Sequence, residues 1–270
     1  MYSIKCDAHT HTLYSAHAYS TIEENVRAAS ELGLELLAST DHFSSMVVAE
    51  DEDIRSYQFF TNQDIWKRVW HGVKVLRGCE VDIVSPEGYL FGMGMPMKKR
   101  ITGDPFKEET DLFERTTGKL DFMIASVHGK WGLQGISKEQ ATRMYITVIE
   151  DPRVLMLGHL GRAGIDFELD ELLKVCKELN KPVEINESSF ICGEGIPEKC
   201  KEIAVRCAEL GTMICVNTDA HISTDVGVFP GAINMLREIE FPEELIMNRD
   251  SESFLANYYK AGFKEIEFDK

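Results

Sequence analysis

The sequence of 270 residues predicts an α/β fold in which seven parallel strands close into a barrel. Seven short apolar runs recur along the chain, and helical stretches separate most of them, a pattern typical of a parallel sheet with helices outside. The runs are apolar almost throughout, as expected when both faces of a sheet are buried. Seven of the eight histidines lie at the predicted end of a strand or just after one, and the active site of such barrels lies at that edge.

The predicted strands are bounded by polar or glycine-containing segments. In chain order they cover residues 4–9, 36–40, 73–81, 120–127, 154–159, 182–186 and 213–218. Between them, helices are predicted over residues 21–32, 137–149, 168–179 and 197–210, with closing helices over 230–239 and 251–259. Ser20 and Glu23 have the spacing of a capping box at the start of the first helix, and Gly33 is a stop signal at its end.

Two stretches interrupt the alternation of strands and helices. Residues 51–70 are polar at first and then aromatic, and we expect these aromatic side chains to pack in the core or at an interface. Residues 85–109 are rich in glycine and proline and are predicted to form an excursion over one end of the barrel. No linker or internal repeat is evident, so residues 1–270 are expected to form a single domain.

Composition narrows the classes of function. The formal net charge of −16 argues against extended binding to a nucleic-acid backbone. No run of about 18 apolar residues is present, so no membrane-spanning helix is expected. The seven cysteines are odd in number and form no C-x-x-C motif, which indicates reduced thiols and a cytoplasmic protein. Homo-oligomerisation stays open.

Polar side chains gather where the apolar runs end. Side chains at positions i and i+2 of a strand point to the same side, so His9 and His11 project together, and so do Asp219 and His221. The full set of candidate metal ligands is His9, His11, His17, His42, Glu80, His128, His159, Asp219 and His221. Imidazole and carboxylate groups on convergent strand ends are typical of a catalytic divalent-metal site.

Taken singly, each of the nine residues has an ordinary structural interpretation, such as a hydrogen-bonded polar residue or a salt-bridge partner. Taken together, they would leave many buried polar groups unpaired in the absence of metal, at a cost of about 1–3 kcal/mol each. One zinc ion uses about four ligands, so nine ligands indicate two or three ions.

The motifs that carry these ligands resemble the signature of the PHP family, named for polymerase and histidinol phosphatase. The matching segments, in order, are His9-Thr10-His11, Thr40-Asp41-His42, Gly78-Cys79-Glu80, Ser126-Val127-His128, Gly158-His159 and Thr218-Asp219-Ala220-His221. The segments 17–21 and 184–190 further resemble the small stand-alone bacterial phosphatases of that family.

This resemblance implies a distorted (β/α)7 barrel with a trinuclear metal cluster at the C-terminal strand ends. Carried over to this sequence, it implies one ion held by His9, His11, Glu80 and Asp219. It implies a second ion that shares Glu80 and adds His128 and His159, and a third held by His17, His42 and His221. This ligand chemistry suits Zn, with Fe or Mn as alternatives.

The resemblance also implies a phosphatase, with no side-chain nucleophile. We expect a metal-bridging hydroxide to attack a phosphomonoester in line, in a pocket whose net charge of about +3 favours a phosphate dianion. Arg162 and Lys130 are candidate contacts for a small phosphorylated substrate. A phosphodiesterase or 3′–5′ exonuclease is an alternative, which the short chain and the absence of a basic groove signature disfavour. A non-catalytic metal-bound interaction domain would have lost ligands, and none of the nine is lost.

Overall fold

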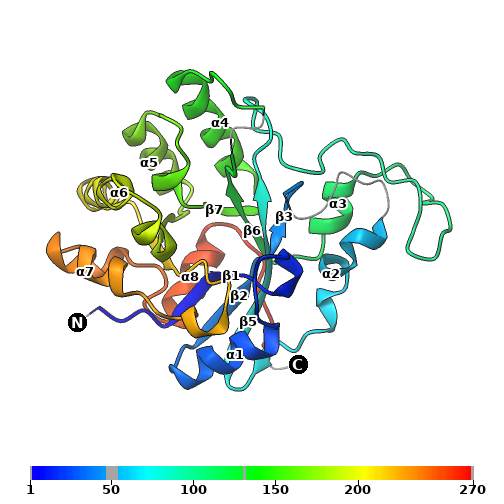
Figure 1. Cartoon of the computed structure of the whole chain (residues 1–270), viewed down its shortest axis with the longest axis horizontal. Helices are drawn as coiled ribbons and strands as arrows, with labels where there is room; N and C mark the ends of the chain where they lie inside the picture. The colour runs from blue at the N-terminus through cyan, green and yellow to red at the C-terminus, as the bar shows by residue number, and fades with distance from the viewer. Residues whose placement is uncertain (1, 47–53, 130–131, 269–270) are drawn as a thin grey trace.

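A computed structural model of the chain describes residues 2–46, 54–129 and 132–268, and it contains the seven predicted strands. Five of them form a parallel sheet in the order β1 (Cys6–Thr10), β2 (Leu36–Ser39), β5 (Val73–Asp82), β6 (Phe122–Ser126) and β7 (Val154–Leu157). The other two, β8 (Val183–Asn186) and β9 (Ile214–Asn217), pair in parallel with each other. In Figure 1 the strands lie at the centre of the molecule.

The two sheets come together to form a distorted barrel. At one seam the backbone N–H of Asp219, just after β9, donates to the carbonyl of His9 on β1 over 2.9 Å. Next to it, the N–H of His11 donates to the carbonyl of Ala220, also over 2.9 Å. At the other seam β7 and β8 contact each other, but no ladder joins them within the described residues. The predicted barrel is therefore confirmed, with two seams that lack a continuous ladder.

Helices surround the strands, as the alternation in the sequence predicts (Figure 1). The long ones are α1 (Ile22–Glu31), α4 (Lys138–Glu150), α5 (Leu169–Glu178), α6 (Ile196–Leu210), α7 (Pro230–Glu238) and α8 (Ser251–Lys260). Two short helices, α2 (Gln58–Thr61) and α3 (Leu112–Thr117), lie outside the regular alternation. None of the helices in the described residues is both long and apolar enough to cross a membrane.

The start of α1 corrects one prediction. The capping box is formed by Thr21 and Glu24, one residue later than the predicted pair of Ser20 and Glu23. The hydroxyl of Ser20 instead accepts a hydrogen bond of 2.7 Å from the backbone N–H of Ser223, which follows β9. Ser20 therefore connects the loop after β1 to the loop after β9. Because this tertiary contact engages Ser20, the capping box forms at Thr21 and Glu24, which have the same spacing in the sequence.

The two irregular stretches have different structures. Within the first, β4 (Val69–Trp70) forms a short antiparallel pair with β5, and the buried rings of Tyr57 and Phe60 pack against Phe43. The expected core role of these aromatic residues agrees with this packing. The second stretch, 85–109, contains isolated bridges but neither helix nor strand, and Figure 1 shows an extended loop beyond α3.

Hydrophobic residues are buried on both sides of the strands. Helix α8 covers the end of the barrel opposite the histidines. Helix α8 places Phe254 and Tyr258 among buried residues of β2, β5 and β6, and the Tyr258 hydroxyl donates to the carbonyl of Asp121 at the start of β6.

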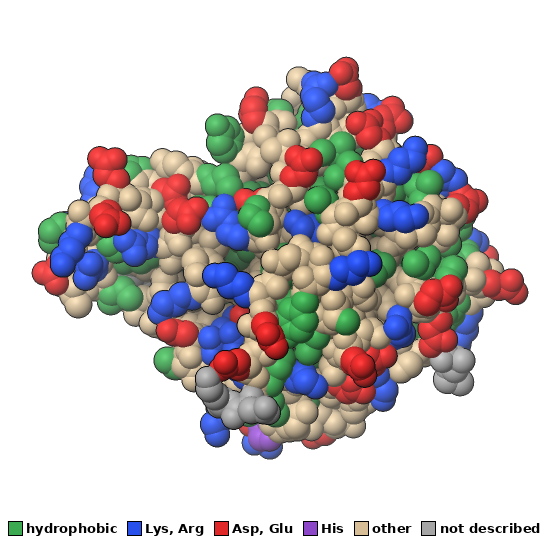
Figure 2. All heavy atoms as spheres, turned by 180° about the vertical axis from the view of Figure 1, so that it is seen from behind, with side chains coloured by type: hydrophobic (Ala, Val, Ile, Leu, Met, Phe, Trp, Pro, Cys, Tyr) green, Lys and Arg blue, Asp and Glu red, His purple; other side chains and the backbone are tan. Residues whose placement is uncertain are grey.

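All seven cysteines are free, and six of them are buried, with only Cys192 exposed. On the face shown in Figure 2, acidic and basic side chains are interspersed, so this face carries no broad basic surface.

Candidate metal centre

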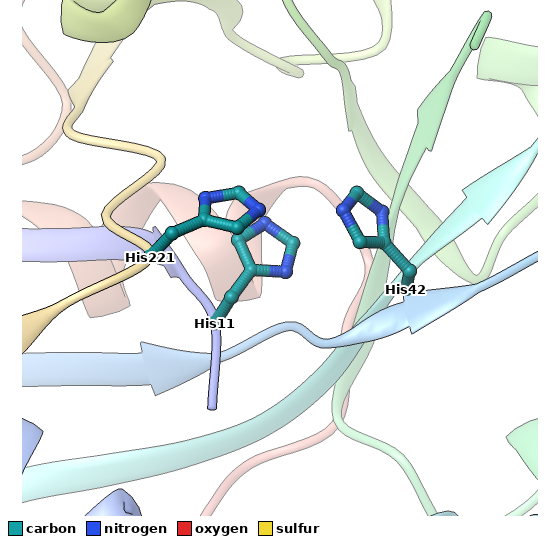
Figure 3. A group of neighbouring side chains, drawn as sticks. All are labelled: His11, His42 and His221. Carbon is teal, nitrogen blue, oxygen red and sulfur yellow. The ribbon is translucent and has the colours of Figure 1, made fainter. Parts of the chain in front are cut away.

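All nine predicted ligands lie in the described residues, and the fold brings them together at the C-terminal ends of the strands. They project from β1 and the loop after it, from the two-residue strand β3 (His42–Phe43), from β5, and from the segments that follow β6, β7 and β9. Strand β3 was not predicted; it pairs with β5 so that His42 lies opposite Glu80. Figure 3 shows His11 and His221 side by side, with His42 facing them from β3.

The carboxylate of Glu80 lies at the centre of the inner part of the cluster. Its Oε2 atom lies 2.8 Å from Nδ1 of His42, 3.4 Å from Nε2 of His9 and 3.6 Å from Nε2 of His11. The side chains of Glu80, His9 and His11 are fully buried. Three imidazoles therefore converge on one carboxylate oxygen.

The other oxygen of Glu80 faces a second pair of imidazoles. Its Oε1 atom lies 2.8 Å from Nε2 of His159 and 3.3 Å from Nε2 of His128, and those two nitrogens are 3.2 Å apart. The hydroxyl of Ser126 donates to the same oxygen over 2.6 Å. Glu80 thus has ligand-type atoms on both sides, which is the arrangement expected of a carboxylate shared between two ions.

A third group lies at the solvent side of the cluster. The Nε2 atoms of His17 and His221 face each other at 2.9 Å, and the ring centroids of His17 and His42 are 5.0 Å apart. The ring of His11 lies 4.2 Å from that of His221 and 4.3 Å from that of His42, centroid to centroid. Four imidazoles are therefore packed close together, which is unfavourable if more than one of them is positively charged.

Several buried polar atoms of the cluster have no hydrogen-bond partner in the described part of the chain. They include Nε2 of His9, Nε2 of His11, Oε2 of Glu80 and Oδ1 of Asp219. Buried polar atoms are almost always hydrogen-bonded in native proteins, and leaving one unpaired costs about 1–3 kcal/mol. These four atoms lie within 4.8 Å of one another, so one cation among them would satisfy all four. The donor set therefore fits a divalent metal.

In two further sets of side chains, the potential ligand atoms also lie within 4.8 Å of one another. All three sets overlap, and they are His9 with His11, Glu80 and Asp219; His42 with Glu80 and His128; and His11 with His42 and His221. The first set coincides with one of the groups that the family resemblance implies. The other two share Glu80 or His11 with it, so the sets form one continuous cluster.

The outer nitrogens of His128 and His11 are held by hydrogen bonds that were not predicted from the sequence. Nδ1 of His128 lies 2.7 Å from a carboxylate oxygen of Asp82, and Nδ1 of His11 lies 3.1 Å from the hydroxyl of Ser15. That hydroxyl in turn donates to Asp41 over 2.7 Å. Because each Nδ1 donates outward, Nε2 keeps its lone pair and faces the cluster, as is typical of metal-bound histidine.

Sequence reasoning could have identified Asp82, because it lies two residues after Glu80 on the same strand and so points to the same side. Ser15 gave no comparable signal. It lies in a short 3-10 turn whose conformation is set by tertiary contacts with Asp41.

Two of the nine residues adopt an unusual backbone conformation. His159 has a φ of 32° and Asp219 a φ of 56°, both in the left-handed region that residues with a Cβ atom rarely occupy. Such a conformation costs roughly 1–3 kcal/mol and persists only when the surrounding structure imposes it. Both residues follow the last residue of a strand by two positions, so the turn after each strand directs these side chains inward.

Electrostatics at the site favour ionised carboxylates. Burial alone lowers the pKa of His9, but the carboxylates of Glu184, Glu80 and Asp219 outweigh it and hold this pKa well above its ordinary value. Burial raises the pKa of Glu80, yet the neighbouring imidazoles outweigh it and hold this pKa well below its usual range. For His11, burial dominates and lowers the pKa well below its ordinary value. The centre therefore attracts positive charge while His11 stays neutral and able to coordinate a cation.

Of the two candidate substrate contacts, Arg162 is the one that lies in the described residues. Arg162 lies beside the cluster, where its Nη2 atom donates to Oδ2 of Asp219 over 2.5 Å and its Nη1 atom donates to Oδ1 of Asn186 over 3.2 Å. Its side chain is 21% exposed, so it also reaches solvent. Lys130 lies outside the described residues.

Comparisons with known proteins bear on this site. The family model described as the PHP domain matches residues 7–188. A probable phosphatase of Clostridium botulinum (strain Langeland) is 36% identical over 264 residues, covering 97% of this chain and 98% of that protein. A probable phosphatase of Photobacterium profundum is 36% identical over 261 residues, covering 96% of each chain.

Among solved structures, the histidinol phosphate phosphatase of Lactococcus lactis, determined with zinc, histidinol and phosphate, has a TM-score of 0.53. The two chains are 20% identical, and the match covers 88% of this chain and 94% of that one. This likeness shows a shared fold.

Proposed function

The chain belongs to the PHP domain family, and from this premise we propose that it is a metal-dependent phosphatase acting on phosphomonoesters. One observation carries the proposal: nine imidazole and carboxylate side chains converge at one barrel end, and several of their buried atoms have no hydrogen-bond partner among the described residues. The relatives named probable phosphatases match almost the whole chain, which supports the same activity here.

The proposed centre holds three divalent ions. His9, His11, Glu80 and Asp219 would hold one ion; Glu80, His128 and His159 a second; and His17, His42 and His221 a third. Zinc suits this ligand set, and it is the metal present in the histidinol phosphate phosphatase of similar fold. Residues 1–270 would form a single domain, because β9, beyond the matched segment 7–188, carries the loop that supplies Asp219 and His221.

Metal ions in such a site lower the pKa of bound water toward about 7 and stabilise negative charge on phosphoryl oxygens. The exposure of the ligands differs from one side of the cluster to the other. His9, His11 and Glu80 are completely shielded from water, whereas the side chains of His128 and His221 are 14% and 27% exposed. A substrate would therefore approach over His128, His221 and His17.

The guanidinium of Arg162 donates to Asp219 at the edge of the cluster, and we propose that it also contacts the phosphate. A guanidinium can present two N–H groups to a phosphate, which fixes the orientation of the group as well as its position. No side chain of the cluster has to act as a nucleophile in this proposal. The substrate in this proposal is a small phosphorylated metabolite, whose leaving group would extend toward solvent.

The proposal is tested by the hydrolysis of two model substrates, p-nitrophenyl phosphate and bis(p-nitrophenyl) phosphate, with metal analysis of the same sample. We expect two to three ions per chain and hydrolysis of the monoester that a chelator abolishes and added zinc restores. Preference for the diester would favour a phosphodiesterase, and one ion or fewer after purification with abundant metal would refute the trinuclear centre.

His71→Ala is the matched control for substitutions of the histidine ligands. His71 pairs with Glu23 on the surface at 2.8 Å and lies outside the cluster. Its replacement should leave both metal content and activity unchanged.

A further inference from the structure

Strand β8 supplies none of the nine candidate ligands, yet it contains a buried carboxylate, Glu184, beneath the cluster. Oε1 of Glu184 lies 2.7 Å from Nδ1 of His9 and accepts a hydrogen bond of 2.9 Å from the Asn217 amide. Its Oε2 accepts a hydrogen bond of 2.6 Å from the backbone N–H of His159 and one of 3.2 Å from the Asn186 amide. Glu184 thus has four donors around its two oxygens.

The contact with His9 determines which ring nitrogen carries the proton. A carboxylate that accepts hydrogen bonds from three other donors does not itself donate, so Nδ1 of His9 must carry a proton. When the ring is neutral, the other nitrogen, Nε2, then has a free lone pair. That Nε2 atom lies 3.4 Å from Glu80 and 3.5 Å from Asp219, where the proposed ion would be held.

The contact with His159 acts on the backbone. His159 has a φ of 32°, and its N–H group points at Oε2 of Glu184. This hydrogen bond crosses the seam between β7 and β8, where no ladder joins the two strands in the described structure. Glu184 therefore stabilises a strained residue at the place where regular sheet pairing is missing.

We propose that Glu184 is a positioning residue that sets the tautomer of His9 and the backbone of His159 for divalent-metal binding. This inference rests on the proposed function, since it assigns Glu184 a role toward the same ions. It also assigns a role to β8, so that every strand of the barrel contributes to the site. Partners of this kind typically change metal affinity by about 10- to 100-fold when they are replaced.

The substitution Glu184→Gln tests the proposal because glutamine has the same shape but only one acceptor oxygen. The backbone N–H of His159 and the Asn186 amide cannot accept here, so the glutamine oxygen should face these two donors. The glutamine amide nitrogen then faces His9, and the hydrogen bond from the Asn217 amide is lost. Nδ1 of His9 then becomes the acceptor, and the proton moves to Nε2, the atom that should bind metal.

Two measurements follow. Zinc affinity, measured by competition with a chelating dye, should fall about 10- to 100-fold in Glu184→Gln. Nitrogen-15 NMR of the metal-free proteins, recorded at a pH high enough for the His9 ring to be neutral, should show its proton on Nδ1 in the wild type and on Nε2 in the variant. Unchanged zinc affinity together with an unchanged His9 tautomer would overturn the proposal.

Glu187→Gln is the matched control. Glu187 follows β8 and accepts hydrogen bonds of 2.8 Å from the backbone N–H groups of Gly231 and Ala232 at the start of α7, remote from any imidazole of the cluster. The control should keep the zinc affinity and the His9 tautomer of the wild type, and a similar loss in both variants would reduce the effect to general destabilisation.

If Glu184→Gln does not fold, Glu184→Asp replaces it, since aspartate accepts without donating and should preserve the Nδ1–H tautomer. An Nε2–H tautomer in Glu184→Asp would refute the role of the carboxylate. If the wild type itself binds no zinc, the proposed function fails, while the NMR measurement on metal-free protein still decides the role of Glu184.

Discussion

At the scale of single residues, the carboxylate of Glu80 is the group on which most of the cluster depends. Its two oxygens face imidazoles on opposite sides, at 2.8 Å from His42 and 2.8 Å from His159. A ligand at the edge, such as His17, faces only the outer group. The two positions should therefore respond differently to substitution.

Glu80→Gln should lower kcat and metal content more than His17→Ala does, because the amide removes the negative charge shared by two of the proposed ions. We expect loss of about two ions per chain in the first variant and about one in the second, in proportion to the number of ions each residue contacts. Metal analysis and steady-state kinetics on the same preparations check this. Near-normal activity in Glu80→Gln would show that the carboxylate is not shared.

Arg162→Ala should raise KM for a phosphomonoester while kcat and metal content stay close to those of the wild type. A contact formed equally with the substrate and the transition state changes only KM. Metal content should persist because the Asn186 amide still donates to Oδ2 of Asp219 over 3.2 Å when the guanidinium is gone. Loss of metal in this variant would show instead that Arg162 acts through Asp219.

The sequence predicted the candidate ligands better than the groups that orient them. Histidines at strand ends form a visible pattern, since apolar runs mark where each strand stops. Glu184 is hidden within such a run, in the segment Val183–Asn186, and a single carboxylate there gives no indication of what it contacts. Its partners His9 and Asn217 come from other strands, so only the closed barrel shows their relation.

At the scale of secondary-structure elements, the seven strands and six long helices were predictable because hydrophobic runs and helix caps are local signals. The two-residue strands β3 and β4 were not, since each exists only by pairing with β5. The choice of cap at α1 was also not local. Ser20 and Thr21 both precede a glutamate by three residues, and a contact with Ser223 takes up Ser20.

Thr21→Ala should destabilise the protein by about 1 kcal/mol, because the N–H of Glu24 loses its side-chain acceptor at the start of α1. Thr21→Ser keeps the hydroxyl and should retain most of that stability. Urea denaturation of both variants measures the difference. Equal stability of the alanine and serine variants would mean that the cap contributes nothing.

The buried amine of Lys181, a residue just before β8, lies against the end of α4. The Nζ atom of Lys181 donates to the carbonyls of Ile149 and Asp151 over 2.6 and 2.8 Å, and burial lowers the pKa of Lys181 to about 8 despite the attraction of Asp151. In the unfolded chain a lysine titrates near 10.4. Between these two values the unfolded state binds more protons than the folded state, so this group's contribution to stability increases with pH.

The free energy of unfolding of the wild type, relative to that of Lys181→Met, should therefore increase by about 1.5 kcal/mol between pH 8 and pH 9.5. Below about pH 7 both states hold the proton and the difference should be flat. Chemical denaturation at a series of pH values checks this. A difference that does not change with pH would place the pKa of Lys181 near its ordinary value.

At the scale of the whole molecule, the ligand cluster spans strands on both sides of the barrel seams. His9 and Asp219 face each other across the seam between β1 and β9, and His159 and Glu184 face each other across the seam between β7 and β8. Metal bound at the cluster would join strands that few backbone hydrogen bonds connect, and its contribution to stability should be large.

Removal of metal with a chelator should accordingly lower Tm by about 5–10 °C relative to protein held at roughly 100 times the Kd for zinc. Differential scanning calorimetry before and after zinc is restored measures the shift. Identical Tm values with and without metal would mean that the seams are stable without it.

The closure of the barrel at β1 and β9 has a consequence for how the protein is made in the cell. Translation delivers His9 and His11 first, whereas Asp219 and His221 leave the ribosome only after all seven barrel strands have emerged. A growing chain therefore holds isolated imidazoles for most of its synthesis and cannot assemble the first ion's four ligands until β9 docks beside β1. Metal bound by these four ligands would therefore enter only once β9 lies beside β1, so the last strand of the barrel completes the site.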